Sequence, residues 1–150
     1  MKDLKLLLVN GPNLNMLGIR EPEKYGKVTL QDIETNLKEL AKNNNVELCC
    51  FQSNHEGDLI DVIQKSKNVY DGIIINAGGY THTSVALRDA ISSIQIPTVE
   101  VHMTNIHARE EFRHISLLSG VCIAQAVGFQ ENSYKFALLG LIDYLKKKQN

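Results

Sequence analysis

The sequence has few cysteines, no long hydrophobic run and little net charge, and each shortage excludes a class of protein. Its three cysteines, with Cys49 and Cys50 adjacent inside a strand-like run, give no disulfide framework. The apolar stretch Leu4–Val9 is interrupted by Lys5 and is too short for a signal peptide or a membrane span. A net charge of −1, with lysines scattered except at 146–148, argues against nucleic-acid binding. We therefore expect a cytoplasmic protein with neither nucleic-acid nor membrane partners.

Several catalytic signatures are also missing. The sequence contains no GxSxG, CxxC or HExxH motif. The glycine turn at 77–83 leads into a helix, but it lacks the lysine of a P-loop and the spacing of a dinucleotide fingerprint. Four side chains have the helical spacing of metal ligands: His107, Glu110, Glu111 and His114. Because Arg109 and Arg113 interleave with them, we favour a solvated, charged face and predict no metal site.

The pattern of apolar segments predicts an α/β protein. The 150 residues are 43% hydrophobic and suit one domain, 1–150. Expected strands are Leu4–Asn10, Val46–Gln52, Gly72–Asn76, Pro97–His102 and Gly120–Val127. Expected helices are Leu30–Lys42, Glu56–Lys67, Thr83–Ser93 and about Glu131–Lys148, the last amphipathic through Phe136, Leu139, Leu141, Ile142 and Leu145. Strands without polar alternation, separated by helices, predict a flavodoxin-like, doubly wound, five-stranded parallel sheet in a three-layer αβα arrangement.

One connection is unusually long. The segment at 11–28 exceeds the two to six residues usual between a strand and a helix. It carries Arg20 and Tyr25 between glycines at 18 and 26. Long loops in compact domains are often functional, so we expect this segment to be a lid over the site.

Polar residues cluster at the ends of the expected strands, where ligands bind in open parallel sheets. The first four expected strands end in Asn10–Asn13, Gln52–Asn54, Asn76 and His102, respectively. Asn76 and His82 would reach the same pocket, although a helix-capping role for His82 is about equally supported.

The stretch Pro97–Arg113 combines a strand with an acid–base pair. Glu100 and His102 lie two apart, hence on one face of the strand. A neighbouring carboxylate fixes the tautomer of an imidazole and favours its charged form. Thr104 or Asn105 would cap a helix over Ile106–His114, whose N-terminus would cradle an anion. A satisfied core pair followed by an ordinary helix cap is an equally weighted alternative.

Three blocks of the chain resemble type II 3-dehydroquinate dehydratase. They are NGPNLNMLGIREPEKYG (Asn10–Gly26), INAGGYTHTSVALRDA (Ile75–Ala90) and VEVHMTNIHAREEFR (Val99–Arg113). The resemblance spans essentially the whole chain. It implies a hydro-lyase of the shikimate pathway, serving aromatic amino acid biosynthesis, which removes water from 3-dehydroquinate by anti elimination through an enolate. It implies neither cofactor nor metal.

The resemblance also implies roles for individual residues. Tyr25 would be the base, His102 the acid supported by Glu100, Arg20 a transition-state stabiliser, and Asn13 the holder of a water at the enolate. Substrate would bind to Asn76, His82, Asp89, Met103, Thr104 and Arg113. Asp89 would come from a neighbouring subunit, so the resemblance implies a homo-oligomer, a dodecamer built from trimers. Met103–Thr104 stands where many family members have isoleucine or leucine followed by serine, a departure that keeps the hydroxyl and both backbone donors.

Two other functional classes stay open on the residues alone. A flavin- or nucleotide-binding module would use the loops at 10–15 and 77–83 as phosphate cradles, and nucleotide would then stabilise it against heat. A non-catalytic assembly domain would need neither Tyr25 nor His102.

Overall fold

A five-stranded parallel sheet forms the centre of the molecule. The structure, a computed structural model, describes residues 3–19 and 21–150, except for the side chains of Lys24 and Tyr25. The strands are β1 (Leu4–Asn10), β2 (Val46–Gln52), β3 (Gly72–Asn76), β4 (Thr98–His102) and β5 (Ala124–Val127). They lie in the order β2-β1-β3-β4-β5, and every neighbouring pair is parallel. This is the strand order of flavodoxin-like folds, which confirms the predicted fold class.

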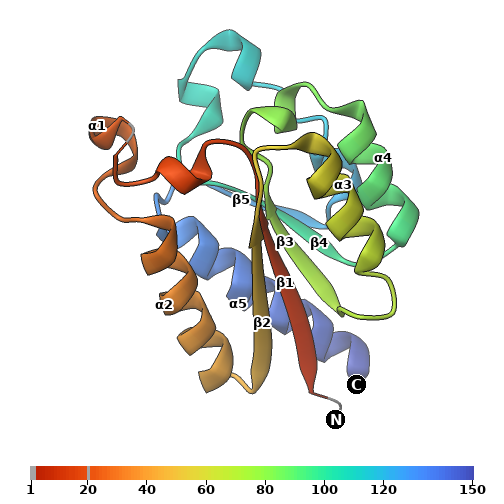
Figure 1. Cartoon of the computed structure of the whole chain (residues 1–150). Coiled ribbons are helices and arrows are strands. Elements are labelled where there is room, and N and C mark those ends of the chain that lie inside the picture. The colour runs from red at the N-terminus through yellow and green to blue at the C-terminus, as the bar shows by residue number, and fades with distance from the viewer. Residues whose placement is uncertain (1–2, 20) are drawn as a thin grey trace.

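Helices cover both faces of the sheet and produce three layers (Figure 1). One face carries α2 (Leu30–Asn43) and α5 (Asn132–Gln149), and the other carries α3 (Glu56–Lys65) and α4 (Val85–Ile94). The loops contain α1 (Pro22–Tyr25) and the 3-10 turns η1 (Leu14–Met16), η2 (Gly78–His82), η3 (Ile106–Ala108), η4 (Glu111–Arg113) and η5 (Ser119–Val121). Within residues 3–19 and 21–150, no helix is long and apolar enough to cross a membrane.

The core is divided between the two faces of the central strands. Leu6 and Leu8 pack towards α2 and α5, whereas Leu7 and Val9 pack towards α3 and α4. All four side chains are buried, which explains why β1 shows no polar alternation. Burying one such side chain stabilises the fold by roughly 1.5–3 kcal/mol, so the strand ends and the residues after them are held firmly in place.

Two predicted elements differ clearly from the structure, whereas the bounds of several others shift by only one or two residues. The fifth strand begins at Ala124 rather than Gly120, because residues 119–121 form the turn η5. Helix α5 buries Tyr134 and Leu138, whereas Phe136 is 46% exposed and meets Phe129 edge-on. The predicted apolar face was wrong at its N-terminal end, because it counted Phe136 and omitted the buried tyrosine.

The helix predicted over Ile106–His114 is absent from the described residues and is replaced by η3 and η4. Asn105 does cap the first turn, through its side-chain oxygen and the His107 N–H (3.1 Å). The chain then becomes extended at Arg109. Beyond the second turn, the Leu117 N–H donates to the Thr81 carbonyl oxygen (2.8 Å). This tertiary contact directs the segment across η2, and it outweighs local helix propensity.

Candidate active site

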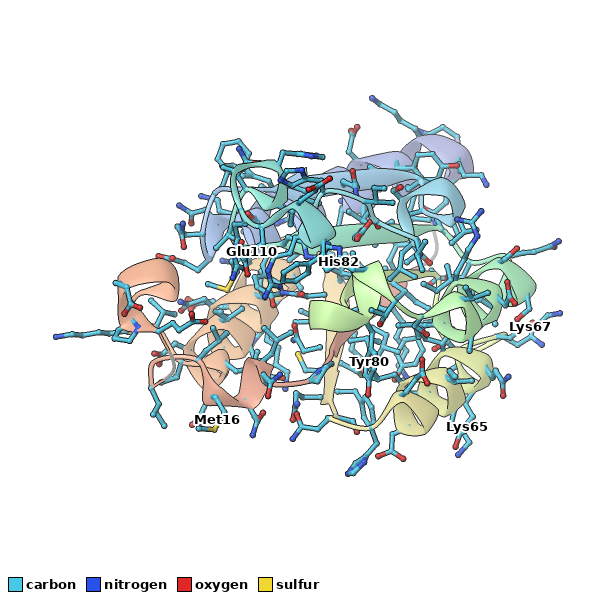
Figure 2. All side chains as sticks on the ribbon, turned by 90° about the horizontal axis from the view of Figure 1, so that it is seen from above. Met16, Lys65, Lys67, Tyr80, His82 and Glu110 are labelled. Carbon is cyan, nitrogen blue, oxygen red and sulfur yellow. The ribbon has the colours of Figure 1, made fainter. Side chains whose placement is uncertain are left out.

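A pocket opens at the carboxyl ends of the strands, where the sequence predicts a ligand. Among the residues that line it are Asn13, Asn76, His82, His102, Met103, Thr104, Arg109 and Arg113. They come from the residue before η1, the end of β3, η2, the end of β4 and the loop after it. The view from above places His82 near the middle of this end of the molecule (Figure 2). The structure therefore brings together most of the predicted site residues that it describes.

Strand β4 supplies an acid–base pair to the pocket. Glu100 is fully buried, His102 is 6% exposed, and His102 Nε2 lies 2.6 Å from Glu100 Oε2. The predicted contact between residues two apart on one face of a strand is thereby confirmed. Because Nε2 is engaged by the carboxylate, Nδ1 is the ring nitrogen left for a ligand.

Several hydrogen bonds keep Glu100 ionised despite its burial. Burial by itself raises the pKa of a carboxyl group, since it penalises the charged form. The hydrogen bond and the electrostatic interaction with His102 outweigh that effect, and the hydrogen bonds from Ser116 and Gln125 add to them. Together they hold the pKa of Glu100 below its ordinary value. The ionised carboxylate is therefore able to accept a hydrogen bond from His102 Nε2, 2.6 Å away.

A buried hydrogen-bond chain orients the amide of Asn76. Asn76 Nδ2 donates to the Tyr134 hydroxyl (2.8 Å), which donates to Asn10 Oδ1 (2.6 Å). Asn76 Oδ1 accepts from the Gly78 N–H (3.1 Å). Burial raises the pKa of Tyr134 well above its usual value, so its hydroxyl remains a neutral donor. Both amide atoms of Asn76 are therefore fixed before any ligand arrives.

His82 stands beside the acid–base pair. Its ring lies 6.3 Å from the ring of His102, at an interplanar angle of 21°. His82 Nδ1 is 2.9 Å from the Ile115 carbonyl oxygen, which can only accept, so Nδ1 carries a hydrogen. This contact ties η2 to the loop after β4. It favours the predicted pocket role of His82 over helix capping, since Ser84 caps α4.

A close backbone approach brings the first loop to the pocket. The Gly11 N–H donates to the Asn76 carbonyl oxygen (2.8 Å), and a Cβ at position 11 would lie 2.5 Å from the Ala77 carbonyl oxygen. Only glycine fits there. Asn13 follows with a φ of 69°, and its N–H donates to Asn54 Oδ1 (2.9 Å).

Two arginines border the same pocket and share one carboxylate. Arg113 Nε lies 3.3 Å from both carboxylate oxygens of Glu110, and Arg109 Nε lies 3.6 Å from Oε1. Arg109 Nη1 also donates to Thr104 Oγ1 (3.3 Å). Glu110 thus faces two arginine side chains. Among the described residues, no three His, Cys, Asp or Glu side chains cluster as metal ligands.

Four predicted site residues are not among those that line this pocket, and one of them, Glu100, lies buried behind His102. Arg20 and the side chain of Tyr25 lie outside the described residues, although the backbone of Tyr25 ends α1. Asp89 is exposed on α4 and is not among the residues that line the pocket. The roles expected of Arg20, Tyr25 and Asp89 stay predictions.

Sequence reasoning missed the side chains behind the pocket. Tyr134, Ser116 and Gln125 lie far from Asn76 and Glu100 in the sequence yet bind them directly. A tyrosine on the buried face of α5 was the available signal, because a buried phenol normally has a hydrogen-bond partner. Ser116 and Gln125 carry no comparable signal.

The fold and the pocket together define an α/β enzyme of flavodoxin-like topology, with a buried Glu–His pair at the carboxyl edge of its sheet. A family model described as "Dehydroquinase class II" matches residues 4–142. The chain therefore belongs to the class II dehydroquinase family of lyases, and the resemblance noted in its sequence is confirmed.

Named relatives match along nearly their whole length. The chain is 54% identical over 150 residues to a 3-dehydroquinate dehydratase of Gloeothece citriformis, covering 100% of this chain and 99% of the relative. It is 55% identical over 143 residues to one from Bacillus cereus, covering 95% and 98%. The crystal structure of type II dehydroquinase from Butyrivibrio crossotus superposes with a TM-score of 0.88 at 46% identity, covering 95% of this chain and 97% of that one.

Proposed function

We propose that this chain dehydrates 3-dehydroquinate to 3-dehydroshikimate by anti elimination through an enolate, as one catalytic domain with residues 11–28 as a lid. The observation that carries the proposal is the buried Glu100–His102 pair facing a polar pocket, in a chain of the class II dehydroquinase family. We further propose that the reaction serves aromatic amino acid biosynthesis in the cytoplasm, without cofactor, metal, membrane or nucleic acid.

Eliminating water from a β-hydroxy ketone needs an acid for the departing oxygen. His102 is proposed for this role because its Nδ1 is free of the carboxylate contact. Nδ1 donates a proton to the leaving hydroxyl, which departs as water. The ring returns to its neutral form and keeps the hydrogen on Nε2 that bonds to Glu100.

The reaction also needs a base at the α-carbon, which we propose is Tyr25 with Arg20 beside it. A phenol ordinarily has a pKa of about 10, so acting near neutrality requires a fall of about two to three units, or about 3–4 kcal/mol. One guanidinium about 4 Å away supplies about 4 kcal/mol at an effective dielectric near 20. A lid that excludes water preserves this interaction.

The remaining groups are proposed to bind substrate and intermediate. Asn13 would hold a water against the enolate oxygen, and Asn76 and His82 would bind substrate hydroxyls. Backbone N–H groups at Met103 and Thr104 would receive the substrate carboxylate, with Arg113 nearby. The fixed amide of Asn76 supports this assignment, because an oriented donor loses little freedom on binding.

An ultraviolet assay tests the proposed function directly. The product is a conjugated enone that absorbs, whereas the substrate does not. Purified protein incubated with 3-dehydroquinate should show a rising enone absorbance. Control samples without the protein or without the substrate should show no rise. Absence of the signal, together with thermal stabilisation by flavin or nucleotide, would instead support a nucleotide-binding module.

Thr104→Ala is expected to raise KM by about 5–30-fold, because the lost hydroxyl bond is worth about 1–2 kcal/mol while the backbone donors remain. The effect on kcat should be smaller than that of any change at His102. Steady-state kinetics measures both, with Ser92→Ala as an exposed hydroxyl deletion on α4 for control. Complete loss of binding in Thr104→Ala contradicts this account of the carboxylate site.

We also propose that the protein forms a homo-oligomer, specifically a dodecamer built from trimers, in which Asp89 of one subunit completes the pocket of its neighbour. Asp89→Ala is expected to raise KM about 10–100-fold, as loss of a hydrogen bond from a charged group would, without lowering Tm. Asp61→Ala, at another exposed helical aspartate, is the matched control. Sedimentation showing a fully active monomer at assay concentration overturns this proposal.

A further inference from the structure

The Glu100 carboxylate is the meeting point of three separate segments. Ser116 Oγ, in the loop after β4, lies 2.7 Å from Oε2 and 2.9 Å from Oε1. Gln125 Nε2, on β5, lies 2.7 Å from Oε1. Thr81 Oγ1, on η2, lies 3.1 Å from Oε2 and 3.4 Å from His102 Nε2. Each segment thus contributes one side chain to a single carboxylate.

The direction of two of these bonds is fixed by the chemistry of the partners. Ser116 Oγ accepts hydrogen bonds from the backbone N–H groups of Leu118 (3.1 Å) and Ser119 (3.0 Å). Its lone pairs are therefore occupied, and its hydrogen points to Glu100. The amide nitrogen of Gln125 can only donate. Both oxygens of Glu100 therefore accept hydrogen bonds, and the proton that Glu100 shares with His102 lies between Oε2 and His102 Nε2, which are 2.6 Å apart.

That shared proton decides whether His102 can act as an acid. With the proton on Nε2, the imidazolium gives up the hydrogen on Nδ1 and becomes a neutral ring. With the proton on Oε2, the ring is already neutral, and the same donation would leave an imidazolate. Donors to the carboxylate stabilise its ionised form and therefore favour the first arrangement.

We propose that Ser116 and Gln125 are positioning residues that keep the shared proton on His102 rather than on Glu100. The inference rests on the proposed role of His102 as the acid. The other titratable groups at the pair are His82, stacked 6.3 Å away, and Cys122, which interacts electrostatically with Glu100. Burial raises the pKa of the Cys122 thiol to about 12, so Cys122 adds no charge near neutrality.

A variant at Gln125 can distinguish this positioning role from a purely structural one. The residue is exposed on β5, a strand at the edge of the sheet, yet its side chain reaches the buried Glu100. Substitution at an exposed edge position creates no cavity, so Tm is expected to fall by only the few degrees that correspond to one lost hydrogen bond. A change in the chemistry of His102 in such a variant cannot be attributed to unfolding.

The test uses Ser116→Ala and Gln125→Leu in enzyme labelled with 15N at histidine. The ring signals of His102 are assigned by difference from His102→Gln. In each variant the ring nitrogens should move from imidazolium towards neutral positions, and kcat should fall about tenfold with KM within about twofold. Tenfold corresponds to about 1.4 kcal/mol, at the low end for a hydrogen bond to a charged group.

Two matched control variants test whether the effect depends on the hydrogen bonds donated to Glu100. Ser119→Ala removes a hydroxyl of the same loop, one that donates to the Ser116 carbonyl oxygen (3.2 Å) and not to Glu100. Ser116→Thr keeps a hydroxyl at the carboxylate. Both should retain the imidazolium signals. Unchanged ring signals and kcat in Gln125→Leu overturn the inference, and this holds even if Ser116→Ala fails to fold. The ring signals are measured without substrate turnover. A protein that is inactive on 3-dehydroquinate would therefore contradict the proposed function but would not by itself contradict the positioning role of Ser116 and Gln125.

Discussion

Tyr25→Phe is expected to lower kcat by about 10²–10⁴-fold while KM changes only a few-fold. The substitution keeps the aromatic ring and removes only the oxygen that would take the α-proton. Positioned acid–base catalysis contributes about that range of rate. Steady-state kinetics with the enone assay gives kcat and KM, and α-proton exchange in deuterium oxide should fall in parallel with kcat.

Arg20→Ala is expected to resemble Tyr25→Phe at neutral pH, since the phenol then keeps its ordinary pKa of about 10 and stays protonated. Unlike the phenylalanine variant, it should regain activity as the pH rises and the phenol ionises. Tyr144→Phe, at a partly exposed tyrosine on α5, is the control and should behave as wild type. A Tyr25→Phe enzyme that exchanges the α-proton at the wild-type rate contradicts the assignment of the base.

The architecture could be predicted because local and global signals agree. Runs such as Leu4–Asn10 and Gly72–Asn76 are apolar because helices cover both faces of the sheet (Figure 1). The polar residues after them then fall at one edge. The Glu100–His102 contact follows from strand geometry alone, because residues two apart share a face.

The loop after β4 could not be predicted, because its shape is decided by partners distant in the sequence. Residues 106–114 have a helical pattern, but the structure forms two 3-10 turns there, and just beyond them the Leu117 N–H donates to Thr81 and the Ser116 hydroxyl donates to Glu100. Tyr134 illustrates the same limit, since its partners Asn10 and Asn76 belong to other strands. Such contacts become visible only when the strands are placed side by side.

His102→Ala is expected to lower the rate of dehydration by about 10²–10⁴-fold while sparing exchange of the substrate α-proton. The two steps need different groups: the base removes the proton to form the enolate, and the acid is required only when the oxygen leaves. Without the acid, the enolate forms and returns to substrate, which acquires deuterium from the solvent. Proton NMR of residual 3-dehydroquinate measures the exchange, and the enone assay measures dehydration on the same sample.

The substitution must be distinguished from general damage, because Glu100 is fully buried and loses a partner 2.6 Å away. Donors from Thr81, Ser116 and Gln125 remain on the carboxylate, so the fold should survive, as a thermal melt would show. His107→Ala, at an exposed histidine in η3, is the matched control and should be as active as wild type. If His102→Ala loses exchange as completely as dehydration while Tyr25→Phe keeps it, the acid and the base have been assigned in reverse.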